Sequence, residues 1–106
     1  MGSARVRMPA RASAGEIIEI RALVQHPMES GFRPDAMGRP IPRHIIRLFT
    51  CHYDGNEVFR AALYPAVATN PYFGFHIRAV ASGDVVFRWE DDQDGVATYT
   101  ARLTVS

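Results

Sequence analysis

The chain has 106 residues, of which 47% are hydrophobic, and its formal net charge at pH 7 is +1. This length predicts one domain over residues 1–106 with a core that needs no disulfides, and the composition argues against a disordered chain. The near balance of 12 basic and 11 acidic residues gives no reason to expect nucleic acid or an anionic membrane as the main partner. Residues 1–3 resemble a cloning remnant.

A lone cysteine, Cys51, excludes an intrachain disulfide and any zinc site that needs several thiolates. The apolar runs are too short to span a membrane, and the first residues lack the apolar stretch of a signal peptide. We therefore expect a domain that is not inserted in a membrane and has no signal peptide of its own.

Two strands are expected in the first quarter of the chain. A short one over residues 4–8 places Val6 between two arginines, and residues 9–15 are a polar connector. Residues 16–26 then carry apolar side chains at every second position, which is typical of a strand with one buried face. These side chains are Ile18, Ile20, Ala22 and Val24.

Residues 26–42 have a different character, because they contain four prolines and two glycines. Proline has no N–H to donate and fixes φ, so this stretch cannot continue a β-ladder. We expect a long loop, and long loops in compact domains usually have a function.

Residues 43–63 predict a β-hairpin. Ile45, Phe49, Cys51 and Tyr53 share one face, interrupted by Arg47, and the opposite face carries Ile46, Leu48, Thr50 and His52. The dipeptide Asp54-Gly55 tolerates the positive φ angles of a tight hairpin turn.

The rest of the chain predicts an irregular crossover over residues 64–70 and three further strands. Val85, Phe87 and Trp89 share a face, so Trp89 is expected to be buried, and residues 91–95 form an acidic turn that we expect to be solvated. About seven short strands without helical periodicity predict an all-β, immunoglobulin-like antiparallel β-sandwich. A small closed barrel is the alternative.

Cys51 and His52 could suggest a thiolate–imidazolium nucleophile. Adjacent strand residues point to opposite faces, so these two cannot pair, and we expect a buried structural thiol and no catalytic residue. An enzyme that uses Cys51 with another histidine stays open as an alternative.

Four histidines with Cys51 and Met28 could suggest a blue-copper site. The turn at residues 91–95 offers no histidine, cysteine or methionine, and His44 and His52 would lie roughly 26 Å apart along one strand. The three aspartates of this turn, Asp91 among them, could suggest a calcium-binding loop, but the glutamate that closes such a loop is missing. We expect no metal and no cofactor, and a metal-binding or electron-transfer sandwich is the alternative function.

Two stretches carry a resemblance to a known family. One runs from His26 to Gly31 and continues with Ile41-Pro42-Arg43, and the other runs from Leu63 to Tyr72. With Phe49-Thr50-Cys51 between them and Phe87-Arg88-Trp89 beyond, the chain resembles SoxZ from about residue 6 to residue 105. SoxZ is one half of the SoxYZ carrier of bacterial thiosulfate oxidation.

The resemblance implies a non-catalytic subunit that forms a heterodimer with SoxY and meets the other Sox enzymes through that complex. SoxY bears the cysteine that carries the sulfur intermediates, on an arm ending in Gly-Gly-Cys. This chain ends within a strand pattern, so it resembles the Z half. The resemblance also implies a periplasmic protein that is exported together with SoxY.

The surface that meets SoxY is predicted to combine the long loop with the crossover, because the apolar loop residues Met28 and Phe32 would otherwise be exposed to water. The alternative is that Met28 and Phe32 fold back onto the core of this domain. The predicted partner-binding residues are His26, Pro27, Met28, Glu29, Gly31, Phe32, Tyr64, Pro65, Asn70, Pro71 and Tyr72.

Overall fold

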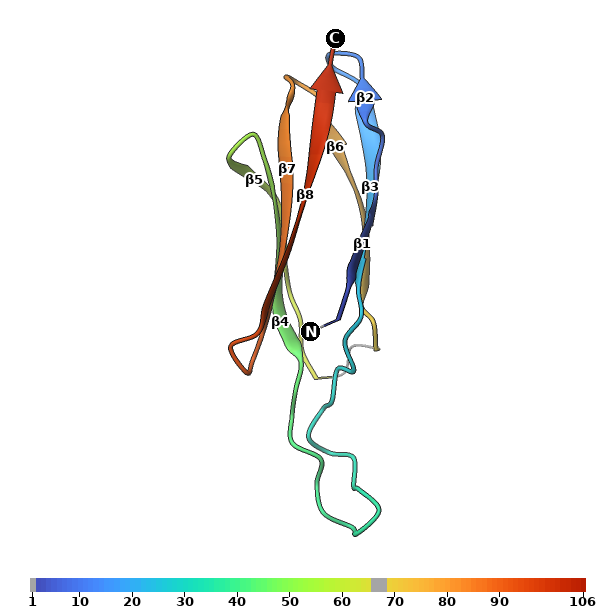
Figure 1. The fold of residues 1–106 in the computed structure, drawn as a ribbon, viewed down its shortest axis with the longest axis vertical. Helices are drawn as coiled ribbons and strands as arrows, with labels where there is room; N and C mark the ends of the chain where they lie inside the picture. The colour runs from blue at the N-terminus through green and yellow to red at the C-terminus, as the bar shows by residue number, and fades with distance from the viewer. Residues whose placement is uncertain (1, 66–68) are drawn as a thin grey trace.

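Two facing β-sheets make up the molecule in the computed structural model, which describes residues 2–65 and 69–106 (Figure 1). The smaller sheet has the order β1 (Ala4–Arg7), β3 (Ile17–Val24) and β6 (Tyr72–Arg78). The larger sheet has the order β2 (Arg11–Ala12), β8 (Val96–Val105), β7 (Gly83–Asp91), β4 (Ile46–Tyr53) and β5 (Asn56–Ala62). The predicted immunoglobulin-like β-sandwich is confirmed. All pairings of the named strands are antiparallel except that of β2 with β8, which is parallel. β2 lies within residues 9–15, which were expected to be a connector.

The core lies between the sheets and is rich in aromatic side chains. Phe49 on β4 stacks on Phe73 of β6 with ring centroids 4.5 Å apart, and its ring centre lies 5.0 Å from that of Trp89 on β7. Trp89 is fully buried, as its position in the period-two pattern predicted. Ile18, Ile20, Ala22 and Val24 of β3 are also buried, so this core ties the two sheets together.

The predicted hairpin is formed by β4 and β5. Asp54 and Gly55 have φ angles of 50° and 81°, as a two-residue hairpin turn requires. A β-bulge between Ile46 and Leu48 changes the alternation at the start of β4. Ile46 is therefore fully buried, and its predicted place on the face opposite Phe49 and Cys51 was wrong.

The molecule is elongated, with extents of 58 × 20 × 20 Å. Residues 25–45 extend beyond the sheets at the end opposite the C-terminus (Figure 1). As expected, none of the strands falls within this loop. Within the described residues there is no helix of the length and hydrophobicity that a membrane crossing needs.

Candidate functional site

The long loop is folded into a two-sided arm. Glu29 and His44 exchange two backbone hydrogen bonds of 2.8 and 2.9 Å, and Pro34 and Pro40 form a second isolated bridge. At the tip, Asp35 Oδ1 accepts hydrogen bonds from the backbone N–H groups of residues 37 and 39, at 2.8 and 2.9 Å. Local hydrogen bonds thus shape the arm although its prolines prevent a continuous ladder.

Asn70 holds the outgoing side of the arm at its base. Its Oδ1 accepts the backbone N–H of His26 at 2.9 Å, and its own N–H donates to the His26 carbonyl at 2.8 Å. Asn70 has a φ of 50°, a left-handed conformation that asparagine tolerates better than most residues. The start of β6 is thereby connected to the end of β3.

The turn after β7 holds the returning side. Asp92 accepts hydrogen bonds from the Ile45 backbone N–H at 3.0 Å and from Arg43 Nε at 2.9 Å, and its own N–H donates to the Ile45 carbonyl. The side chains of Asp91 and Asp92 are only 2% and 12% exposed. The expectation of a solvated turn was therefore wrong for these two aspartates, because both serve as acceptors for the arm.

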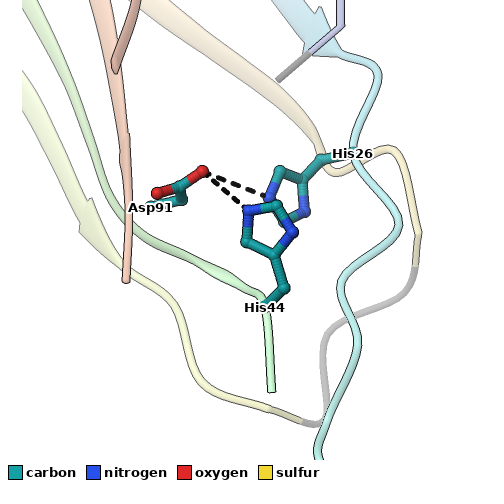
Figure 2. Close-up of side chains that lie close together, drawn as sticks. All are labelled: His26, His44 and Asp91. Carbon is teal, nitrogen blue, oxygen red and sulfur yellow. Dashed lines mark hydrogen bonds and ion pairs between the residues drawn. The ribbon is translucent and has the colours of Figure 1, made fainter. Parts of the chain in front are cut away.

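Asp91 lies beside two histidine rings at the base of the arm (Figure 2). Its Oδ2 is 2.8 Å from His44 Nε2 and 3.8 Å from His26 Nε2, and the two ring centres are 4.5 Å apart. Its Oδ1 accepts the backbone N–H groups of Gln93 and Gly95 at 2.9 and 2.6 Å. We call these three side chains the His–Asp–His cluster.

The cluster holds a charged carboxylate beside a neutral imidazole. Burial raises the pKa of Asp91, but the hydrogen bonds from His44, Gly95 and Gln93 outweigh it and leave this pKa below its usual value. Burial and the nearby His44 lower the pKa of His26, against the opposing attraction of Asp91. His26 is therefore expected to be uncharged at pH 7.

The tautomer of His26 decides whether the cluster suits a metal. The ligand atoms of the three side chains lie within 4.8 Å of one another, which is close enough to share an ion. However, the Met28 N–H donates to His26 Nδ1 at 3.0 Å, so the neutral ring carries its proton on Nε2, the atom that faces Asp91. A histidine bound to metal through Nε2 normally donates from Nδ1, which is already an acceptor here. The cluster is therefore better suited to holding the base of the arm against β7 than to binding a metal ion.

Cys51 is unsuited to act as a nucleophile. It points into the core from β4 and is fully buried, whereas the neighbouring His52 lies on the other face. Burial raises the pKa of its thiol to about 12, so the reactive thiolate is scarce at neutral pH.

The predicted partner-binding residues differ widely in exposure. Phe32, Tyr64 and Tyr72 are 84%, 69% and 56% exposed, which is unusual for large apolar side chains. His26 and Met28 are 1% and 5% exposed, because they pack at the base of the arm. Among the remaining predicted residues, Pro71 is buried, Glu29, Gly31 and Pro65 are half-buried, and Pro27 and Asn70 are exposed.

The buried members of that set cannot offer their side chains to a partner in this conformation. They are His26 and Met28 at the base of the arm and Pro71 before β6. Residues 66–68 of the predicted crossover lie outside the described residues.

Phe32 and Tyr64 meet at the end of the sandwich. They line a mostly apolar hollow of about 530 Å³ together with Ser30 and Pro65, and we call these four residues the end surface. Gly31 makes the position of Phe32 possible, because its φ is 90° and a Cβ there would lie 3.2 Å from Arg43 Cβ. Tyr72 lies elsewhere, on the outer face of β6, and lines a different hollow.

The His–Asp–His cluster was missed by the sequence reasoning, although a signal was present. Asp91 continues the inward series of Val85, Phe87 and Trp89, so its side chain should enter the core side of β7. A carboxylate in that position needs hydrogen-bond donors.

Comparison with protein families gives one match, to the model of "Sulphur oxidation protein SoxZ", over residues 6–102. The chain belongs to the SoxZ family. Membership assigns it a role in the Sox system of sulphur oxidation and confirms the resemblance seen in the sequence. A search of curated protein sequences found no significant match.

Solved structures with a similar fold include superoxide reductases and a sulfur carrier protein. A superoxide reductase (neelaredoxin) variant from Ignicoccus hospitalis is 17% identical with a TM-score of 0.74, covering 99% of this chain and 81% of that one. The sulfur carrier protein SoxY from Chlorobium limicola f thiosulfatophilum is 11% identical with a TM-score of 0.69, covering 97% and 78%. A putative superoxide reductase from Thermotoga maritima is 19% identical with a TM-score of 0.68, covering 97% and 85%. At these identities the likeness establishes the fold alone.

Proposed function

We propose that this chain is a non-catalytic subunit that pairs with SoxY, and that the pair carries covalently bound sulfur intermediates during thiosulfate oxidation. The match to the SoxZ family over residues 6–102 carries the proposal. In this account the chain works in the periplasm, is exported together with SoxY, and meets the other Sox enzymes as part of the complex.

The state of Cys51 supports a non-catalytic role. A carrier or nucleophile needs an accessible thiolate, and the thiol of Cys51 is buried with a raised pKa. The His–Asp–His cluster offers no better candidate, because Asp91 is saturated with hydrogen bonds and the proton of His26 faces it.

The end surface is the part of the chain that we propose contacts SoxY. Large aromatic side chains that are exposed in the free subunit and gathered in one hollow are typical of the energetic centre of an interface. The hydrogen bonds at the base of the arm hold Phe32 in place before binding, which lowers the entropy cost of association. A stable heterodimer needs roughly 800 Å² of buried surface on each side, so neighbouring parts of the arm would contribute as well.

The test is association with purified SoxY from the same source, measured by titration calorimetry at micromolar concentration. The unaltered chain should bind, whereas Phe32→Ser and Tyr64→Ser should each weaken binding by about 30-fold, because an interface centre loses about 2 kcal/mol per anchor.

Val80→Ser is the matched control. Val80 is 67% exposed and lies two residues before Ser82, which hydrogen-bonds to the backbone of Val105, so its replacement should leave affinity within about threefold of the unaltered chain. If the unaltered chain shows no association, the proposed pairing is wrong. If Val80→Ser weakens binding more than Phe32→Ser does, the partner docks at the other end.

A further inference from the structure

The outer face of the small sheet presents three arginines side by side. Arg5 and Arg7 alternate with inward residues on β1, and Arg21 does so on β3, so all three side chains point to solvent. The strand register aligns Arg7 directly with Arg21 and Arg5 with Leu23. Like charges in directly opposite positions destabilise a strand pair, and this register places them so.

The charge of this group is only partly balanced among the described residues. Among the described residues, Glu19 pairs with Arg21 at 2.7 Å, and no carboxylate forms an ion pair with Arg5 or Arg7. The outer face of the large sheet is different, because several of its arginines have acidic neighbours, although Arg11 on β2 has none in the described part of the chain. Arg47 and Arg88 share Glu90, and Arg102 pairs with Asp84.

The third strand leaves space beside the arginines. β6 places Gly74 opposite Arg21, and the Tyr72 hydroxyl lies 3.2 Å from the position that a Gly74 Cβ would take. The result is a hollow of about 280 Å³ with guanidinium groups on one side and apolar groups on the other. It is lined by Arg5, Arg7, Arg21, Ala22, Leu23 and Tyr72.

We propose that this arginine hollow binds a sulfur oxoanion of the thiosulfate type, in which one sulfur bears oxygens and another does not. Guanidinium groups match oxoanion oxygens with two parallel hydrogen bonds, and a bound anion would relieve the Arg7–Arg21 repulsion. The bare terminal sulfur is larger, more polarisable and more weakly hydrated than the oxygens, so it fits beside Leu23 and Tyr72 better than another oxygen would. The choice of a sulfur anion rests on the family's role in sulphur oxidation, which is part of the proposed function.

A small anion suits this site better than an acidic protein surface does. A protein interface needs several hundred Å² with an apolar centre, and the apolar side chains that line this hollow are few. The hollow is instead large enough for one small anion with some of its water.

The test is titration calorimetry of the full-length chain with sodium thiosulfate, with sodium chloride holding the ionic strength constant. We expect saturable binding that becomes about tenfold weaker in Arg7→Gln and in Arg21→Gln, because each loses a charge-assisted hydrogen bond. Arg102→Gln is the matched control on the large sheet and should bind as the unaltered chain does.

A second measurement is the melting temperature without anion. Arg7→Gln should raise it relative to Arg102→Gln, because this change removes the positive charge that lies directly opposite Arg21.

Three results would overturn the assignment. They are no saturable binding above the chloride background, equal weakening in Arg102→Gln, and sodium phosphate binding as tightly as thiosulfate, since phosphate has no bare sulfur for the apolar side. If the arginine variants weaken association with SoxY while thiosulfate does not bind, the face is a protein-docking surface and the oxoanion proposal is wrong. These outcomes are separate from the pairing test, because binding of the anion is measured without SoxY.

Discussion

At the scale of single residues, His26 shows how a polar side chain can be fully buried in an apolar sandwich. Its Nδ1 accepts the Met28 N–H, and its ring meets the edge of His44. Its Nε2 lies 3.8 Å from the Asp91 carboxylate, too far for a hydrogen bond, so Asp91 acts on it through charge alone. Both its backbone groups are bonded to Asn70. The residue therefore joins the arm to β6 and β7 while it remains neutral.

His26 should make stability depend on pH in the mildly acidic range. Because its pKa in the folded chain lies below the ordinary 6.5, the unfolded chain takes up the proton first as the pH falls. The free energy of unfolding should therefore decrease below about pH 6.5, by at most about 1.4 kcal/mol per pH unit for one proton. Urea unfolding between pH 7.5 and 5 measures this decrease.

The control for this prediction is a histidine replacement. His26→Gln should flatten the pH profile, because it removes the buried ring that the unfolded chain protonates first. A profile for the unaltered chain that is flat from pH 7.5 to 5 would contradict the assignment of a buried neutral ring.

At the scale of elements, the sequence predicted what depends on local rules. Period-two alternation located all the strands except the two-residue β2, and Asp54-Gly55 located the hairpin turn. The face of Ile46 was mispredicted because a bulge shifts the alternation, and nothing in the residues of β4 alone marks it. Alternation therefore predicts a strand's buried face only as far as its pairing stays regular.

The contacts at the base of the arm were harder to predict from the sequence, because they join residues that are far apart along the chain. His26 was correctly placed at the start of the long loop, but its partners Asn70 and Asp91 lie far along the chain. Asp92 similarly reaches back to Arg43 and Ile45. Covering of Phe32 by a partner and packing of Phe32 on the domain's own core were both open from the sequence. The fold was needed to show that Phe32 is exposed beside Tyr64 and that Tyr72 lies on a different surface.

Asp91 should matter far more for stability than its neighbour in the same turn. Asp91→Asn removes the charge and places an amide beside the His44 ring and two backbone N–H groups, so we expect a loss of about 2–3 kcal/mol. Asp94→Asn should change stability by less than about 0.5 kcal/mol, because Asp94 is exposed and asparagine tolerates its φ of 62°. Urea unfolding at pH 7.5 compares the two. Similar losses in both variants would show that the Asp91 hydrogen bonds contribute little.

At the scale of the whole molecule, the elongated sandwich presents two separate surfaces on one rigid core. The end surface gathers exposed aromatic side chains, and the small sheet gathers arginines on its outer face. The thiol lies between the sheets, away from both surfaces. This arrangement suits a subunit that holds a partner and leaves the covalent sulfur chemistry to it.

The most direct test of this account is the intact mass of both subunits, measured without reductant on the complex with SoxY purified from cells that are oxidising thiosulfate. We predict sulfur adducts on SoxY and an unmodified mass for this chain, because Cys51 is buried with a pKa of about 12. A sulfur adduct on this chain that forms in the native state would contradict the account.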